Sequence, residues 1–349
     1  MTTNTLNVGV IGAGRMGITH HSIINTLPGV RVTAVTDPSS VVTSLLEKYT
    51  GVRAYGDHAS MLEREPLDAV LVCTPPVHNY DILRLAHAKG LHAFVEKPFI
   101  LSSAAGHELA RMFDDAGLVN QVGYMNRFND VFCRARALVG EGLLGRVLRF
   151  RSEMYSGTIV REQEKSNWRA THANGGGAVY EMATHVIDLI QYLFGRPDRV
   201  AGTSLTPVFS RDVEDIVSST FHYRSGPSGT IYVNWSDDSF RKPTNKLEVF
   251  GDRGKILADQ HGMRIYLREA DPARGLASGW NDVYITDVFS SVPFYLRGIE
   301  YTAQLEHFVA CIRAADRRPT RCSFADAAAT IAVTEDLFRD HAATVREMN

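Results

Sequence analysis

The sequence has few cysteines, no long apolar run and no excess of either charge. Its four cysteines, Cys73, Cys133, Cys311 and Cys322, are scattered and form no C-x-x-C pair, which argues against a zinc ribbon and against a disulfide framework. No apolar stretch approaches the roughly 20 residues that a membrane-spanning helix needs. The 37 basic and 39 acidic residues give a formal net charge of -2, and no basic run is long enough to favour nucleic acid or an anionic membrane surface.

The remaining composition is that of an ordinary globular protein. Hydrophobic residues make up 44% and charged residues 22% of the 349 residues, a length that predicts two domains. Residues 1–7 are polar and lack the apolar core of a signal peptide. We therefore expect a cytoplasmic protein with reduced cysteines, no nucleic-acid partner and no membrane partner.

Residues 6–125 alternate between short apolar runs and helical patterns. Such an alternation indicates βαβ units and a parallel sheet, which places the protein in the α/β class. We expect the first domain to span residues 1–125. Its strands are predicted at 6–11, 31–36, 68–73, 92–95 and 118–122, and its helices at 16–27, 41–49, 80–89 and 102–115.

The pattern changes after Gly123, where strand-like stretches follow one another. Grouped strands predict an α+β domain of residues 126–349 with a large, open and mostly antiparallel sheet. One face of this sheet would carry helices, and the other could carry another subunit. The strands are predicted at 146–155, 199–205, 215–223, 229–235, 246–251 and 255–259, and the helices at 128–139, 178–194, 299–314 and 324–347; the final helices could instead pack back on the first domain.

The segment G-A-G-R-M-G at residues 12–17 follows the first strand and opens the first helix. Glycines permit the tight turn and the close approach of a pyrophosphate, and the helix N-terminus offers free N–H groups to the phosphates. Asp37, at the end of the second strand, is placed to hydrogen-bond the adenosine ribose and to repel a 2′-phosphate. This context predicts a Rossmann domain that binds NAD, although Arg15, Ser39 and Ser40 keep NADP as an alternative. The other interpretation is a plain glycine turn with a capping aspartate.

Two further strand ends lie at the edge where ligands bind in open α/β sheets. The segment T-P-P-V-H at 74–78 follows the third strand, and His78 has two interpretations, catalysis or a hydrogen bond within the loop. The segment E-K-P-F at 96–99 follows the fourth strand. Lys97 would lie beside the nicotinamide, where it can hydrogen-bond a substrate hydroxyl and share in proton transfer, unless it is a solvated loop lysine. The expected cofactor-binding residues are Gly12, Gly14, Arg15, Met16, Gly17, Asp37, Thr74, Pro75, His78, Glu96 and Lys97.

A second set of candidates follows three glycines at 175–177, which let the backbone approach a ligand closely. Glu181 and His185 are four residues apart in a predicted helix, so they share one face. Histidine is the natural base for an alcohol proton near neutral pH, and Glu181 can orient the imidazole or bind a neighbouring hydroxyl. The alternatives are ordinary polar residues of a helix or a metal pair. Because the spacing offers no third ligand, no metal is expected.

Together these motifs resemble the glucose–fructose oxidoreductase / inositol dehydrogenase / rhizopine-catabolism (Gfo/Idh/MocA) family over nearly the whole chain. The matching segments are the glycine motif with Asp37, residues 74–78, 96–98, 123–128 and 175–188, and the closing stretch 304–308 with Asp326. The resemblance implies a nucleotide-binding domain and an α/β domain with an open sheet, through which members commonly form dimers or tetramers. It also implies that Lys97, Glu181 and His185 form the catalytic group. Glu181 stands where the common pattern has aspartate; it keeps the charge and reaches one methylene further.

Related enzymes place substrate-pocket residues at Arg127, Trp168 and Arg169. A flat aromatic side chain next to hydrogen-bonding groups suits a sugar ring, whereas the alternative for Trp168 is a plug between the domains. The full set of expected substrate-binding residues is Arg127, Tyr155, Trp168, Arg169, Asn174, Glu181 and His185.

The resemblance therefore implies an NAD(P)-dependent dehydrogenase that oxidises a secondary hydroxyl of a sugar, a sugar derivative or an inositol to a ketone. Two alternatives keep the cofactor: a redox-neutral glycoside hydrolase or lyase that uses NAD transiently, and a non-catalytic NAD-binding regulator. Lys97 and His185 argue against the regulator, because a sensor needs no proton-transfer pair. A homodimer or homotetramer formed through the second sheet is expected.

Overall fold

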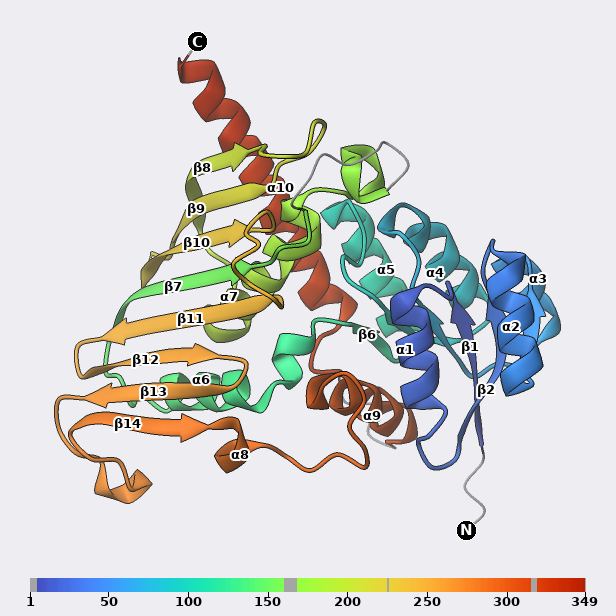
Figure 1. Ribbon diagram of the computed structural model, residues 1–349, viewed down its shortest axis with the longest axis horizontal. Coiled ribbons are helices and arrows are strands. Elements are labelled where there is room, and N and C mark those ends of the chain that lie inside the picture. Colours follow the sequence, from blue (N-terminus) through green and yellow to red (C-terminus); the bar gives the residue numbers. More distant parts are fainter. Residues whose placement is uncertain (1–4, 160–167, 225, 315–318, 349) are drawn as a thin grey trace. The chain divides into compact units, whose positions relative to one another are not determined.

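The computed structural model describes residues 5–159, 168–224, 226–314 and 319–348, and the chain divides into two units (Figure 1). The first unit comprises Met1–Met125 and Val292–Ala328, and the second comprises Asn126–Ser291 and Ala329–Asn349. The segment 292–328, which follows the second sheet in sequence, thus belongs to the first unit. No helix in the described part of the chain is long and apolar enough to cross a bilayer.

The first unit is built on a six-stranded parallel sheet with the order β3-β2-β1-β4-β5-β6. Every residue of β4 is fully buried, as expected for a parallel strand that is covered on both faces. The strands are β1 (Leu6–Ile11), β2 (Val30–Thr36), β3 (Arg53–Tyr55), β4 (Ala69–Val72), β5 (His92–Val95) and β6 (Asn120–Val122).

Short polar signals delimit the helices of the first unit. The Ser39 side chain caps α2, and Gly51 ends it with a φ of 72°. Ser102 caps α5 in the same way as Ser39 caps α2. The strand β3 and the helix α3 were not predicted, because three half-exposed edge residues and a seven-residue helix leave almost no periodic pattern. The helices are α1 (Arg15–Ile24), α2 (Ser40–Thr50), α3 (His58–Arg64), α4 (Asn79–Ala88), α5 (Ser103–Asp115) and α9 (Ile299–Arg313).

The second unit is built on an eight-stranded sheet with the order β14-β13-β12-β11-β7-β10-β9-β8. Among the described strands, β7 and β10 form the one parallel pair and all other neighbours are antiparallel, which confirms the predicted mostly antiparallel sheet. The last two strands were not predicted. The strands are β7 (Val147–Tyr155), β8 (Arg199–Thr206), β9 (Ile216–His222), β10 (Ser228–Asn234), β11 (Thr244–Gly251), β12 (Gly254–Asp259), β13 (Gly262–Leu267) and β14 (Gly279–Tyr284).

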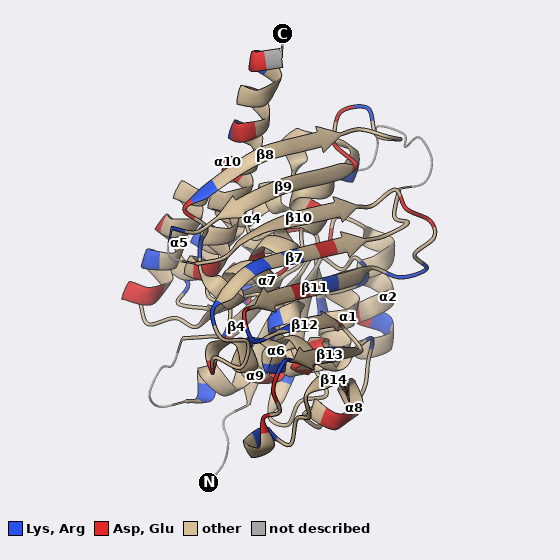
Figure 2. Cartoon of the chain, turned by 90° about the vertical axis from the view of Figure 1, so that its left-hand side faces the viewer, with Lys and Arg blue, Asp and Glu red and all other residues tan. Residues whose placement is uncertain are grey.

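Helices cover one face of this sheet and leave the other open (Figures 1 and 2). The helices of the second unit are α6 (Asp130–Gly140), α7 (Thr184–Phe194), the short α8 (Ile285–Val288) and most of α10 (Phe324–Met348). Phe150 and Met154 of β7 are buried in one core with Ile187 and Ile190 of α7. Because side chains alternate along a strand, Arg151 and its neighbours two residues away face the opposite side.

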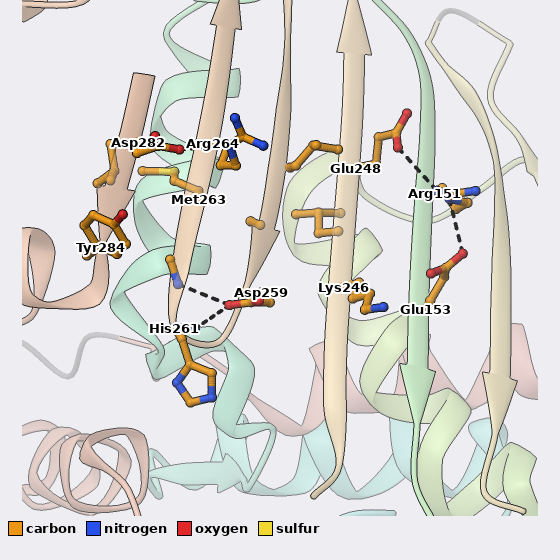
Figure 3. A pocket seen from close by; sticks show the side chains of 15 residues that line it. Arg151, Glu153, Lys246, Glu248, Asp259, His261, Met263, Arg264, Asp282 and Tyr284 are labelled. Atoms are coloured by element: carbon orange, nitrogen blue, oxygen red, sulfur yellow. Dashed lines mark hydrogen bonds and ion pairs between the residues drawn. The ribbon is translucent and has the colours of Figure 1, made fainter. Parts of the chain in front are cut away.

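The open face is hollowed by a cavity of about 610 Å³ (Figure 3). Its walls come from β7 and from β11 to β14, and charges of both signs line it. Arg151 of β7 contacts Glu153 of its own strand and Glu248 of β11, with N···O distances of 3.2 and 3.5 Å. The Asp259 carboxylate accepts the His261 N–H at 2.7 Å in the turn between β12 and β13.

Candidate active site

Gly12 and Gly17 shape the turn that joins β1 to α1. Gly12 has a φ of 90°, and a Cβ there would lie 2.7 Å from the carbonyl oxygen of Cys73. A Cβ on Gly17 would lie 1.8 Å from the carbonyl oxygen of Gly12, so the helix can approach this closely only at a glycine. Gly14, by contrast, is exposed and has no atom within 4 Å of its Cβ position.

The start of α1 fits the phosphates of a dinucleotide. No side chain in the described part of the chain caps this helix, Arg15 is exposed and Met16 is half-buried. Uncapped N–H groups and the positive end of the helix dipole favour an anion at this place. The open space over Gly14 gives that anion room.

Asp37 follows β2 and lies against the glycine turn. One of its carboxylate oxygens accepts the Ala13 N–H at 2.8 Å, and the other accepts the Ser39 N–H at 2.9 Å. The carboxylate is therefore fixed at the sheet edge, and a ribose hydroxyl can reach its remaining lone pairs. This position fits the predicted ribose ligand.

The loop after β4 is tied to the loop after β5. The Thr74 hydroxyl donates to the Asn79 side-chain oxygen at 2.7 Å, and the Asn79 amide donates to the Phe99 carbonyl at 2.9 Å. Pro75, in the first of these loops, is half-buried. His78 is exposed, and its ring makes no hydrogen bond to the described residues, so the loop hydrogen bond considered from the sequence is not formed.

Lys97 follows β5 and is half-buried. Its N–H donates to the neighbouring Glu96 carboxylate at 3.2 Å, and that carboxylate also contacts the ring of His20 on α1, with 2.5 Å between Nε2 and Oε1. The parallel strands thus bring residues 12–17, Asp37, 74–78 and 96–97 to one edge of the sheet. His20 is a residue that the sequence patterns did not indicate, because its partner lies 76 positions away.

The segment that carries Glu181 and His185 does not begin as a regular α-helix. Val179–Ala183 form a π-helical turn, in which the Thr184 N–H reaches the Val179 carbonyl, and α7 continues from Thr184. Such turns are rare and occur often at functional sites. The four-residue spacing of the two candidates therefore spans a widened turn instead of the predicted α-helical one. His185 is buried and Glu181 is half-buried.

Two of the three glycines before this turn, Gly176 and Gly177, lie close to other protein atoms. A Cβ on Gly176 would lie 2.2 Å from the Arg169 carbonyl oxygen. Gly177 has a φ of 97°, and its Cβ would lie 2.4 Å from a carboxylate oxygen of Glu214. The same oxygen accepts the Val179 N–H at 2.7 Å. The glycines thus allow a close approach of the chain to itself, and Glu214 holds the start of the helical segment.

Glu181 pairs with a neighbour from the preceding loop. The Arg169 Nε donates to its carboxylate at 3.3 Å. The Arg169 guanidinium also lies 4.6 Å above the ring of Trp168, so one face of that ring is already covered by a cation. The structure therefore brings Trp168, Arg169 and Glu181 together, and Asn174 is half-buried in the same loop.

Two other residues that were predicted to bind substrate, Arg127 and Tyr155, contact side chains of the second unit. Arg127 forms a buried ion pair with Asp188 of α7, with Nε and Nη2 donating at 2.9–3.1 Å. Tyr155 donates to Glu153 at 3.1 Å and stacks on Phe240 at 4.5 Å between ring centres. It lies in phase with Glu153 on the open face of the sheet, whereas α7 covers the other face. The structure does not bring Tyr155 to His185.

Two protein-family models match parts of the chain. Residues 6–124 match the oxidoreductase family with an NAD-binding Rossmann fold, and residues 132–257 match the GFO/IDH/MocA C-terminal domain. Together these matches cover more than two thirds of the chain.

The relatives include dehydrogenases and a hydratase. The chain is 25% identical over 312 residues to scyllo-inositol 2-dehydrogenase (NAD(+)) of Bacillus subtilis, a match that covers 87% of this chain and 85% of that protein. It is 28% identical over 262 residues to 2,7-anhydro-N-acetylneuraminate hydratase of Escherichia coli, covering 73% and 68%. A levoglucosan dehydrogenase solved with NADH and levoglucosan shares the fold, with a TM-score of 0.86, 20% identity and 97% of each chain covered. The first unit is therefore an NAD-binding Rossmann domain, and the chain belongs to the GFO/IDH/MocA family of oxidoreductases.

Proposed function

We propose that this protein is a dehydrogenase that oxidises a secondary hydroxyl of a sugar, a sugar derivative or an inositol to a ketone, with NAD as the hydride acceptor. The observation that carries the proposal is the position of Lys97. It follows β5 at the edge of the sheet where the uncapped N-terminus of α1 and the carboxylate of Asp37 also lie. The inositol and anhydrosugar dehydrogenases among the related proteins support the substrate class.

The first unit would hold the cofactor through backbone and carboxylate groups. The N–H groups at Gly14 to Met16 would bind the pyrophosphate, and Asp37 would accept a hydrogen bond from the ribose. We propose NAD over NADP because the Asp37 carboxylate repels a 2′-phosphate. The bound nicotinamide supplies the acceptor for the hydride that leaves the substrate carbon.

The chain's own groups would manage the proton. His185 would take the proton of the reacting hydroxyl as a general base. Lys97 would donate a hydrogen bond to the same oxygen and stabilise the negative charge that develops there. Glu181, held by Arg169, would fix a neighbouring hydroxyl, so that this ion pair presents both an acceptor and a donor to a polyol.

The substrate-binding residues that we propose in the second unit are fewer than those expected from the sequence. We propose Trp168, Arg169 and Asn174 as the substrate-binding residues, with Glu181 and His185. Arg127 would act through Asp188, which follows His185 on the same helix, by holding α7 in place. Tyr155 packs on the open face of the sheet with Phe240 and is left out of this set.

A second candidate is a redox-neutral lyase or hydratase that uses NAD transiently. The similarity to the Escherichia coli hydratase favours it. Such an enzyme would convert its substrate without net formation of NADH, which separates it from a dehydrogenase in the same assay.

We propose that a second copy of this chain covers the open face of the eight-stranded sheet (Figure 2). That face carries pairs of opposite charge, among them Arg264 and Asp282 at 2.9 Å, beside the cavity of Figure 3. A surface that carries both signs can pair with itself across a two-fold axis. Sedimentation should show a dimer or tetramer that Arg264→Glu weakens, and a monomeric wild type would contradict the proposal.

The test of the activity is a substrate panel with matched variants. The purified protein is mixed with NAD or NADP and with aldoses, glycosides, anhydrosugars and inositols, and nicotinamide reduction is followed. We expect reduction with one class, its loss in Lys97→Ala and His185→Ala with NAD binding retained, and no change in Lys89→Ala, whose lysine pairs with Glu63 on the surface. Full turnover in both site variants would overturn the assigned roles.

A further inference from the structure

His20 and Glu96 form a buried contact between α1 and the end of β5. The His20 side chain is fully buried, and its Nε2 lies 2.5 Å from Oε1 of Glu96, whose side chain is 12% exposed. The rings of His20 and Phe94 of β5 make a T-shaped contact, with 5.1 Å between the ring centres. One side chain thus connects the helix of the glycine turn to the strand that precedes Lys97.

The Glu96 carboxylate is fixed from more than one side. Its Oε2 accepts the N–H of Lys97 at 3.2 Å, while Oε1 is held by His20. The Glu96 N–H donates to the Val72 carbonyl at 2.8 Å. A Cβ on Gly123 would lie 3.1 Å from Oε1, so the glycine leaves room for the carboxylate. The Glu96 carboxylate therefore links the His20 ring to the backbone N–H of Lys97.

The chemistry of the pair explains why a histidine occupies this apolar place. A carboxylate accepts hydrogen bonds and does not donate them, so a hydrogen bond to Glu96 requires a hydrogen on Nε2 of His20. A buried carboxylate is costly without a donor. The other ring nitrogen, Nδ1, is buried and has no hydrogen-bond partner among the described residues. Among the described residues, Glu96 is therefore the hydrogen-bond partner of the His20 ring.

We propose that His20 is a positioning residue for Lys97: it orients the Glu96 carboxylate, and that carboxylate holds the peptide of Lys97 at the end of β5. The inference rests on the proposed role of Lys97 in catalysis. Without His20, Oε1 loses its donor and the carboxylate can rotate away from the Lys97 N–H. His20 itself does not touch the substrate, so its removal should impair the chemical step and spare cofactor binding.

Three variants separate this role from general destabilisation of the helix. His20→Leu removes the donor and suits the apolar surroundings, whereas His20→Gln places an amide N–H at a reach similar to that of Nε2. His21→Leu is the matched control, because His21 is the next buried residue of α1 and its Nε2 has no hydrogen-bond partner in the described chain. We expect His20→Leu to lower kcat by about 10²-fold, since a small displacement of a catalytic group has that effect. KM for substrate and Kd for NAD should stay near the wild-type values, His20→Gln should recover most of kcat, and His21→Leu should stay close to the wild type.

A second measurement does not depend on turnover. Amine-specific labelling followed by mass spectrometry gives the modification rate of Lys97, with the surface residue Lys89 as an internal reference. We expect the rate at Lys97 to change in His20→Leu and to return in His20→Gln, with Lys89 unchanged. If the wild type oxidises no polyol, the proposed function fails and labelling alone decides the inference. Equal losses in the His20 and His21 variants, no recovery with glutamine, or unchanged labelling of Lys97 would each overturn it.

Discussion

Glu214 is a buried acid that contacts the start of the segment that carries His185. The residue is 7% exposed, and its carboxylate accepts the Val179 N–H at 2.7 Å. Burial, and to a smaller extent the charge of Asp215, raise the pKa of Glu214 from 4.5 to about 7, against the lowering effect of the Val179 N–H. The charge of Glu214 therefore changes near neutral pH.

The raised pKa fixes the direction of a stability change. The folded chain holds this proton more tightly than the unfolded chain does, so Glu214 contributes stability that is fully present below pH 4.5 and lost as the pH rises through about 7. At about 1.4 kcal/mol for each pKa unit, that contribution is about 3 kcal/mol. Glu214→Gln cannot ionise and keeps an acceptor for Val179. We expect its unfolding free energy, relative to the wild type, to rise by about 2–3 kcal/mol between about pH 5 and pH 8.

Tryptophan fluorescence in denaturant titrations measures this difference. The three tryptophans, Trp168, Trp235 and Trp280, all belong to the second unit, so their signal follows the unfolding of the part that contains Glu214. Glu269→Gln, at an exposed acid of the same unit, should leave the pH dependence unchanged. Parallel pH profiles for Glu214→Gln and the wild type would refute the reasoning.

Three further substitutions test other parts of the structure. Arg127→Met leaves its buried carboxylate partner without a guanidinium, and we expect denaturant titration to show a loss of about 3–5 kcal/mol; a loss below about 1 kcal/mol would contradict the buried pair. Asp37→Ser should weaken NAD binding and strengthen NADP binding in calorimetric titrations, and an unchanged preference would exclude Asp37 as the ribose ligand. Gly177→Ala should destabilise the protein by more than the roughly 1 kcal/mol expected from a positive φ, because the new Cβ meets Glu214 at 2.4 Å. Gly195→Ala is its control, with a φ of 77° and open space, and equal losses in the two variants would argue against the clash.

The sequence was sufficient to predict the features that depend on local order along the chain. The carboxyl ends of parallel strands share one edge of a sheet, so the glycine turn, Asp37 and Lys97 could be placed at that edge before the fold was known. The burial pattern of the second sheet also follows from alternation. The same alternation puts Tyr155 in phase with Arg151 and Glu153, a signal that would have assigned Tyr155 to the open face.

Contacts between distant segments could not be predicted in this way. The contact of His20 with Glu96 spans 76 residues, and that of Glu214 with Val179 spans 35. The three glycines before α7 indicated a close approach, but no local pattern tells whether a ligand or another part of the chain makes it. The π-helical turn at Val179–Ala183 likewise has no periodicity of its own in so short a segment.

The most direct test of the central proposal follows the hydrogen on the substrate carbon. An active polyol from the panel is prepared with deuterium at the reacting carbon and incubated with NAD, and the nicotinamide product is analysed by mass spectrometry. We expect deuterated NADH from the wild type and none from Lys97→Ala or His185→Ala, both of which should still bind NAD. Conversion of the polyol without deuterated NADH, or full label transfer by both variants, would contradict the proposed hydride transfer and the roles assigned to these two residues.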